Sequence, residues 1–314
     1  MKGRILVLDP IDAHALDRLR DTFEVVVRLQ PGRKELIGLV GDADAIVLRS
    51  GARLSAEVLT AARRLRVVAR AGSGTDNIDL AAARDAGVRV FNVPGASAEA
   101  VAELALGLTL ALTRKIALAD RQVRAGVWDK PALAGPQLAG RTLGVVGYGG
   151  IGSRIAALAQ GFSMRTLAAA EHGGEERRRA LARQGTRLVE LPALLRESDV
   201  VCLAVPLTAR TRHLIAAPEL HAMRRSAYLV NVSRGDVVDE DALAAALRDG
   251  TIAGAALDVF TQEGDAGALA ALDNVVLTPH IGAMSVDVQR LIGDIVADSI
   301  ITALDGGAVA NQLC

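Results

Sequence analysis

Short apolar runs rich in β-branched residues alternate with longer segments of helical composition along most of the chain. In the first half the apolar runs are RILVLD, FEVVVRL, AIVLR, LRVVAR and VRVFNV. The second half continues with TLGVVGYG, RTLAAA, TRLVEL, DVVCLAV, AYLVNVS, IAGAALDV and NVVLTP. Strands that alternate with helices build parallel sheets covered by helices. The pattern predicts an α/β fold with two doubly wound parallel-sheet domains.

The length of 314 residues is long for one hydrophobic core and comfortable for two domains. From Ala98 the segment AEAVAELALGLTLALTRKIALADRQVRAG contains no proline and predicts one long helix between the sheets. A last amphipathic segment, SVDVQRLIGDIVADSIITALDGG, predicts a helix that packs back on the first domain. We expect a discontinuous substrate-binding domain, residues 1–98 with 285–314, and a dinucleotide-binding domain, residues 99–284.

Composition narrows the class of protein. Aromatic residues make up only 2% of the chain, so the core must consist of alanine, valine, leucine and isoleucine. Basic and acidic residues balance at 36 each, which argues against a general affinity for nucleic acid or for anionic membranes. The longest apolar stretch, LALGLTLALT, falls short of the roughly 20 residues of a membrane span. Neither nucleic acid nor membrane is an expected partner.

Cysteine usage and the start of the chain indicate the compartment. Cys202 and Cys314 are the only cysteines, which predicts neither a disulfide framework nor a thiolate metal site. The initial apolar run ILVL is too short for the core of a signal peptide. We expect a soluble cytoplasmic protein without a metal site.

A glycine-rich loop follows the first strand of the second predicted sheet. In GYGGIG, Gly147, Gly149 and Gly152 form a G-x-G-x-x-G pattern between a strand and a helix, with Gly150 and Ile151 inside it. The three glycines permit a tight turn, a close approach of backbone to a pyrophosphate, and packing of helix on strand. The helix N-terminus favours the anion. Glycines that only permit a turn are the alternative, but the strand and helix on either side favour a dinucleotide site.

The dinucleotide pattern also expects an acidic residue after the next strand, where it would bind the ribose hydroxyls of adenosine. Glu171 is the candidate, in RTLAAAEHGG. Arg177, Arg178 and Arg179 follow soon after. Consecutive arginines on a helix point in different directions, so we expect them to form a solvated face rather than a phosphate site.

Charged residues follow three successive strands near the end of the second predicted sheet: Arg234 after AYLVNVS, Asp258 and Glu263 at the end of IAGAALDV and beyond it, and His280 after NVVLT. Ligands of doubly wound sheets bind beyond the carboxyl ends of the strands. A histidine can take a hydroxyl proton near neutral pH, and a carboxylate on its other nitrogen would stabilise the protonated ring. An arginine can hold a carboxylate and polarise a carbonyl. Each could be a surface residue alone, but together they predict hydride transfer at a hydroxyl or keto carbon.

These motifs resemble those of the D-isomer-specific 2-hydroxyacid dehydrogenases, and the resemblance covers nearly the whole chain. The segments that carry it are RAGSGTDNID, NVPGASAEAVAEL, LGVVGYGGIGSRIA, PLTARTRHLI, NVSRGDVVDEDAL, ALDVF and LTPHIGA. The resemblance implies that Arg234, Glu263 and His280 are the catalytic residues. It implies a contact of Asp258 with the nicotinamide amide.

The same resemblance implies further binding residues. The backbone amides of Ser73 and Gly74 would bind the substrate carboxylate, beside Arg234. Pro206 and Thr211, in PLTARTRHLI, would contact the cofactor. The family also implies a homodimer, because its members generally pair through the cofactor domain.

Three positions depart from the family pattern. Ala170 stands at the usual acidic position, which leaves Glu171 one place late, so we expect NAD as cofactor with weak discrimination against NADP. Ser97 stands where the phosphoglycerate dehydrogenase branch often has asparagine, and Gly264 replaces the proline that usually follows the catalytic glutamate. 3-Phosphoglycerate is the leading substrate, for an enzyme of this length without the C-terminal regulatory domain. The alternatives are a glyoxylate or hydroxypyruvate reductase and a non-catalytic, NAD-sensing protein like the family's corepressors.

Overall fold

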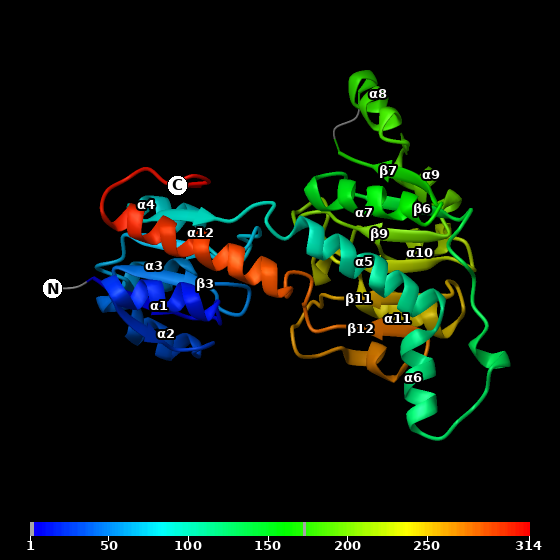
Figure 1. Ribbon diagram of the computed structural model, residues 1–314, viewed down its shortest axis with the longest axis horizontal. Helices are drawn as coiled ribbons and strands as arrows, with labels where there is room; N and C mark the ends of the chain where they lie inside the picture. The colour runs from blue at the N-terminus through cyan, green and yellow to red at the C-terminus, as the bar shows by residue number, and fades with distance from the viewer. Residues whose placement is uncertain (1–2, 172–173) are drawn as a thin grey trace. The chain divides into compact units, whose positions relative to one another are not determined.

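The computed structural model describes residues 3–171 and 174–314. The chain forms two compact units, Met1–Ser97 with Met284–Cys314, and Ala98–Ala283. The sheet of the first unit has the strand order β2-β1-β3-β4-β5, and that of the second has the order β12-β11-β10-β9-β6-β7-β8. Figure 1 shows both sheets with the helices around them. Every pair of neighbouring strands is parallel. The predicted fold class, two doubly wound parallel sheets, is confirmed.

The first unit is built from short strands whose aliphatic side chains are mostly buried. Its elements are β1 (Arg4–Val7), α1 (Ala13–Thr22), β2 (Glu24–Val27), α2 (Arg33–Leu39), η1 (Val40–Asp42), β3 (Ala45–Leu48), α3 (Ala56–Ala61), β4 (Val67–Arg70), α4 (Leu80–Asp85), β5 (Arg89–Asn92) and α12 (Val286–Leu304). Helix α12 packs against α1 through Gly293, where a Cβ atom would approach the Cβ atom of Ala15 to 2.9 Å. Arg18 of α1 adds a hydrogen bond of 3.2 Å to Asp294. These contacts join helix α12, near the end of the chain, to helix α1 of the first unit.

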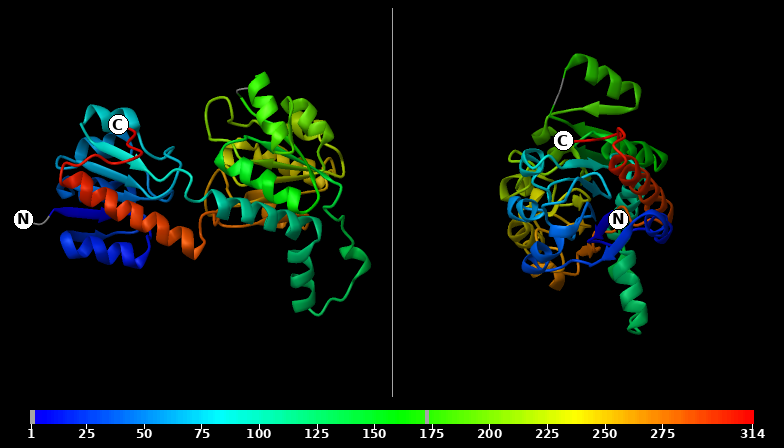
Figure 2. Two further views of the ribbon diagram at one scale, coloured as in Figure 1. Left: turned by 45° about the horizontal axis from the view of Figure 1, so that its top comes forward. Right: turned by 90° about the vertical axis from the view of Figure 1, so that its left-hand side faces the viewer.

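The second unit has helices on both faces of its sheet (Figure 2). Helices α5 and α7 cover one face, and α9, α10 and α11 cover the other. Its elements are α5 (Ala98–Thr113), α6 (Ile116–Arg124), η2 (Pro131–Leu133), β6 (Thr142–Val146), α7 (Gly150–Gly161), β7 (Arg165–Ala169), α8 (Glu175–Arg183), β8 (Thr186–Leu188), α9 (Leu191–Glu197), β9 (Val200–Leu203), α10 (Ala217–Ala222), β10 (Tyr228–Asn231), η3 (Gly235–Val237), α11 (Glu240–Arg248), β11 (Gly254–Leu257), η4 (Gly267–Ala271) and β12 (Val275–Leu277). None of the helices in the described ranges combines the length and apolar character that a membrane span needs.

The prediction of one long helix from Ala98 is wrong. Helix α5 ends at Thr113 and α6 begins after Lys115, whose φ of 52° is left-handed. The Lys115 ammonium donates a hydrogen bond of 2.7 Å to the carbonyl of Ala132 on the returning chain. That return passes so near α5 that a Cβ atom on Gly135 would lie 2.0 Å from the Thr113 carbonyl oxygen. Helix α6 therefore runs away from α5 (Figure 1), and all its residues are at least partly exposed.

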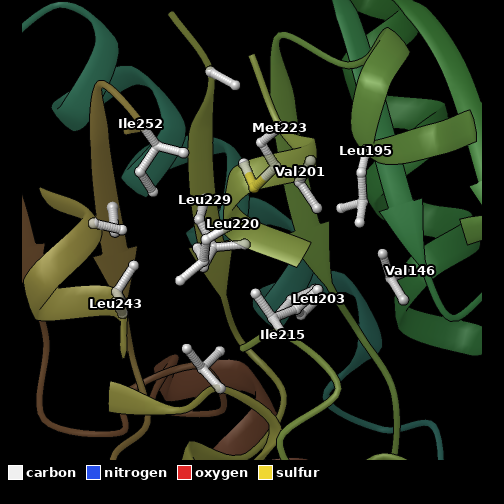
Figure 3. Packing of buried hydrophobic residues seen from close by; sticks show 14 of the residues in the cluster. Val146, Leu195, Val201, Leu203, Ile215, Leu220, Met223, Leu229, Leu243 and Ile252 are labelled. Carbon is white, nitrogen blue, oxygen red and sulfur yellow. The ribbon is translucent and has the colours of Figure 1, made fainter. Parts of the chain in front are cut away.

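Aliphatic side chains fill the core of the second unit. Val201 and Leu203 of β9 pack with Leu229 of β10, Leu220 of α10 and Leu243 of α11 (Figure 3). Cys202, between the two β9 residues, is buried against the other face of the sheet. Burial raises the pKa of its thiol to about 12, so the thiol stays protonated and unreactive at neutral pH.

Candidate active site

The strands of the second sheet end level with one another at their carboxyl edge. Val146 of β6 pairs with Ala169 of β7 on one side and Leu203 of β9 on the other. Leu203 continues the row through Asn231 of β10, and then Leu257 and Leu277. Loops that leave neighbouring strands at the same level meet above the sheet. The order also reverses between β6 and β9, which is where such sheets bind ligands.

The glycine loop has the conformation that a bound dinucleotide requires. Gly147 has a φ of 93°, and a Cβ atom there would lie 2.6 Å from the Ala204 carbonyl oxygen. A Cβ atom on Gly152 would lie 1.9 Å from the Gly147 carbonyl oxygen, whereas space is open at Gly149. Helix α7 begins at Gly150 without a side-chain cap, so its first amides face the loop. This uncapped N-terminus fits a pyrophosphate.

A cavity of about 420 Å³ adjoins the glycine loop. Gly147, Gly149, Glu171, Pro206 and Thr211 line it. The Thr211 hydroxyl donates a hydrogen bond of 2.6 Å to the Pro206 carbonyl and so closes the loop after β9. The other predicted cofactor residues, which do not line this cavity, are Gly150, Ile151, Gly152 and Asp258. The first three open α7, and the last follows β11.

The far wall of the cavity, beyond β7, is more basic than expected. Arg177 lines it and donates a hydrogen bond of 3.0 Å to the Tyr148 carbonyl of the glycine loop. The expectation that Arg177, Arg178 and Arg179 all lie on a solvated face is therefore wrong for Arg177. Arg210, from the loop after β9, also lines the cavity and forms an ion pair with Glu171.

At the other end of the sheet edge, His280 and Glu263 are in contact. The Nδ1 atom of His280 lies 2.5 Å from the Glu263 Oε1 atom. An ionised carboxylate only accepts hydrogen bonds, so in this contact with an ionised Glu263 the Nδ1 atom is the donor, and Nε2 of a neutral ring keeps its lone pair. The imidazole is 30% exposed and the carboxylate 50% exposed, so a substrate can reach both. The pair can exchange a proton with a bound hydroxyl group.

Asp258 holds the loop that carries His280. Its carboxylate is buried and accepts hydrogen bonds from the Thr278 hydroxyl at 2.7 Å and from the amides of Ile281 and Gly282 at 2.8 and 2.9 Å. Its carbonyl accepts a bond of 2.8 Å from the amide of His280, whose φ is 54°. Left-handed backbone is uncommon for residues other than glycine. Asp258 therefore stabilises the backbone that aims the imidazole.

Arg234 is held by a residue that the sequence analysis missed. Asn231, fully buried at the end of β10, donates a hydrogen bond of 2.9 Å to the Arg234 carbonyl. Its side-chain oxygen accepts bonds from the amide and the hydroxyl of Ser233. Next to Arg234, a Cβ atom on Gly235 would lie 1.9 Å from the Phe260 carbonyl carbon. The arginine loop thus packs against the loop that leads to Glu263.

Ser73 and Gly74 belong to the first unit, in the loop after β4. Among residues 3–171 and 174–314, no atom accepts a hydrogen bond from either of their backbone amides. The loop is fixed by Asn92, whose side-chain amide donates a bond of 2.7 Å to the Ser73 carbonyl. Arg70, the last residue of β4, lies buried beside the loop, and a Cβ atom on Gly72 would lie 2.0 Å from its Nη1 atom. Two adjacent amides beside a guanidinium can accept an anion.

Comparison with known proteins identifies the family of the chain. Residues 106–282, more than half of it, match the family model "D-isomer specific 2-hydroxyacid dehydrogenase, NAD binding domain". The chain belongs to this family. It is 39% identical over 310 residues to the D-3-phosphoglycerate dehydrogenase of Methanocaldococcus jannaschii, an alignment that covers 98% of this chain and 59% of that relative.

Two further proteins match this chain over nearly their whole length. The hydroxypyruvate reductase of Thermotoga maritima is 40% identical over 295 residues, which cover 92% of this chain and 94% of the relative. A crystal structure of a protein from Thermus thermophilus is 36% identical with a TM-score of 0.91, and the match covers 99% of this chain and 100% of that one. The family model describes residues 106–282, which lie within the second unit, as an NAD binding domain.

One departure from the family pattern has a structural reason. Gly264, in place of the usual proline, has a φ of 92°. Proline is confined to a φ near −65°, so the loop after Glu263 takes a path here that proline cannot adopt.

Asn231 and Arg70 could not be singled out from the sequence, because each looks like an ordinary strand residue. The available signal was a polar side chain at the last position of a buried strand.

Proposed function

We propose that this protein is an NAD-dependent dehydrogenase that interconverts D-2-hydroxy acids and 2-keto acids. The observation that carries the proposal is the contact between His280 and Glu263 at the edge of a sheet with a complete dinucleotide loop. The buried carboxylate of Asp258 fixes the loop that carries His280. An ordinary surface ion pair would have no need of such a fixed loop. Family membership supports the same chemistry.

The proposed mechanism assigns one task to each side chain. Bound NAD supplies the acceptor for the hydride that leaves the substrate carbon. The lone pair of His280 Nε2 takes the hydroxyl proton, and Glu263 stabilises the resulting imidazolium. Arg234 polarises the oxygen on the reacting carbon, where negative charge develops in the reverse direction. The amides of Ser73 and Gly74 bind the substrate carboxylate.

We propose 3-phosphoglycerate as the substrate, because the first unit offers more positive charge than a small keto acid needs. Arg70 ends β4, and Arg49 follows Leu48, its partner in the neighbouring strand β3. The Arg49 guanidinium donates a hydrogen bond of 3.0 Å to the Gln289 side-chain oxygen, which orients it. Guanidinium groups bind phosphate through paired donors. The similarity to D-3-phosphoglycerate dehydrogenases supports this choice.

Glyoxylate or hydroxypyruvate is the second candidate substrate. It is supported by the similarity to the hydroxypyruvate reductase, whose length this chain nearly spans. A non-catalytic NAD sensor is the third possibility. The deciding experiment measures NADH oxidation with 3-phosphohydroxypyruvate, hydroxypyruvate and glyoxylate, for the native protein and for Arg70→Gln.

We expect the highest kcat/KM with the phosphorylated keto acid, and a loss of about 10-fold or more for that substrate alone in Arg70→Gln, as for a charged hydrogen bond. Equal use of all three substrates, unchanged by the substitution, would favour the reductase. No turnover despite NADH binding would favour the sensor.

We also propose a cytoplasmic homodimer. Helix α6 and the chain after it expose Ile116, Val123, Val127 and Trp128, with Trp128 75% exposed. A second copy of the chain would cover these apolar side chains. The two free thiols fit a reducing compartment. Sedimentation of the native protein and of Trp128→Lys tests the dimer, and a native monomer would contradict it.

A further inference from the structure

The cavity beside the glycine loop has two guanidinium groups where an NAD-specific site would have one free carboxylate. Arg177 of α8 and Arg210 of the loop after β9 both line the cavity, close to the end of β7. Ala170, directly after β7, brings no charge to this place. We infer that Arg177 and Arg210 form a subsite for the 2′-phosphate of NADP(H), so that the protein accepts both NAD(H) and NADP(H). The inference rests on the proposed function, since it assumes that a nicotinamide dinucleotide occupies this cavity.

Glu171, directly after Ala170, lines this cavity, and its carboxylate already has a partner. It forms an ion pair with Arg210, from a segment 39 residues further along the chain. Their side chains are 59% and 80% exposed, so water screens the pair and little free energy holds it together. Glu171 can therefore turn to the ribose hydroxyls of NAD, or turn away when a phosphate occupies Arg210. The pair can exchange partners without a change in the fold.

Arg177 supplies the more rigid half of the subsite. Its Nη2 atom is bound to the Tyr148 carbonyl of the glycine loop at 3.0 Å, which anchors the guanidinium at the cavity wall. Its Nε atom is buried and has no hydrogen-bond partner among residues 3–171 and 174–314. A guanidinium has five N–H donors, so most of them remain for a phosphate. Arg178 and Arg179, on the same helix, instead interact with Leu188 and Glu175.

A second carboxylate explains why we expect dual use rather than strict use of NADP. Glu190, exposed at the start of α9, also lines the cavity. Two arginines thus face two glutamates, and neither cofactor meets a purely repulsive wall. Discrimination between a hydroxyl and a phosphate then depends on which side chains turn toward the ligand.

The test measures ligand binding without catalysis. It uses the full chain and two fragments of the cofactor that lack the nicotinamide. Isothermal titration with 2′,5′-ADP and 5′-AMP compares the presence and absence of the 2′-phosphate. We expect 2′,5′-ADP to bind the native protein about 10-fold more tightly, an advantage that shrinks as salt is raised. Arg210→Gln and Arg177→Gln should each remove most of this advantage, so that 2′,5′-ADP and 5′-AMP bind each variant with similar affinity.

Arg179→Gln is the matched control on the same helix and should behave as the native protein. Glu171→Gln should increase the affinity for 2′,5′-ADP. Thermal unfolding of each variant checks that Arg177→Gln remains folded, and Arg210 is exposed enough to be replaced safely.

Equal affinity of the native protein for both fragments, or an unchanged advantage in both arginine variants, would overturn the inference. Turnover of keto acids with NADH alone, without tighter binding of 2′,5′-ADP, would leave the proposed function intact and reject only the subsite. Tight binding of 2′,5′-ADP without any turnover of keto acids would support the phosphate subsite and reject the proposed function.

Discussion

The two ends of the ligand-binding edge of the second sheet use carboxylates in opposite ways. At the β11 and β12 end, Asp258 is 1% exposed and accepts three hydrogen bonds from the loop around His280. At the β7 end, Glu171 is 59% exposed and pairs with Arg210. The buried hydrogen bonds hold the Asp258 carboxylate in one orientation, whereas the exposed Glu171 carboxylate can exchange partners at little cost in free energy.

The difference agrees with what each end is proposed to do. Proton transfer requires the imidazole within hydrogen-bond distance of the substrate hydroxyl, so its loop must hold one geometry. Choice between two cofactors requires only a difference of affinity, which exposed side chains can supply. Buried, saturated hydrogen bonds are thus found where position matters, and exposed ion pairs where selectivity matters.

The largest effect is expected from His280→Asn, which removes the proton acceptor and keeps a polar side chain. The value of kcat should fall by about 10²–10⁴-fold, the usual contribution of general acid–base catalysis. The affinity for NADH, followed by fluorescence, should stay the same. Steady-state rates with the best keto acid of the panel give the measurement.

Glu263→Gln is the companion variant for His280. It should be milder and should move the kcat profile to lower pH, because the charge that favours the imidazolium is lost. Near-normal turnover in His280→Asn would show that His280 is only a loop residue.

Asp258→Asn should have the next largest effect, and it acts on stability as well as rate. Replacing one carboxylate oxygen by an amino group sets a donor against the part-buried amide of Ile281 or the buried amide of Gly282. A buried donor left without an acceptor costs about 1–3 kcal/mol in the free energy of unfolding. The value of kcat should also fall, because the backbone of His280 loses its support.

Urea denaturation of the Asp258 variant measures this cost. Asp273→Asn is the control, since that exposed carboxylate of the same unit pairs with Arg121 at the surface and should change stability by less than about 0.5 kcal/mol. Equal stability of both variants would contradict the contrast between buried and exposed carboxylates.

The smallest effect is expected from Glu99→Gln, which breaks an exposed ion pair between α5 and the dinucleotide helix α7. The Arg154 guanidinium, hydrogen-bonded to both carboxylate oxygens, lowers the pKa of Glu99 below its usual value near 4.5. Because the pKa of Glu99 is lower in the folded than in the unfolded state, the ion pair stabilises the folded state fully at pH values above the unfolded-state pKa. This stabilisation is lost as the pH falls through the folded-state pKa. The native protein should therefore be slightly more stable than the variant at pH 7.

That difference should disappear as the pH falls through the lowered pKa of Glu99, where the paired carboxylate takes up its proton. Thermal unfolding at a series of pH values measures it, with Glu103→Gln on the same helix as the control. A difference that persists at low pH would mean that Glu99 acts through packing rather than charge.

Local patterns were enough to predict the strands, the dinucleotide loop and the place of His280 after β12. Alternation of apolar runs and the spacing of glycines are properties of neighbouring residues, so they can be read without the fold. The break before α6 could not be predicted, because Lys115 carries no local signal for a left-handed φ. Its conformation depends on Ala132 and Gly135, which return to the end of α5.

The sequence by itself determined which chemical groups stand at the strand ends, among them Arg234, Glu263 and His280. Only the tertiary structure decided which groups face one another. Glu171 meets Arg210, and Asp258 binds the loop around His280, because the strand order β12-β11-β10-β9-β6-β7-β8 brings together loops that are distant in the chain. Periodicity is a local property of a sequence, whereas the partner of a charged side chain depends on how the strands are ordered.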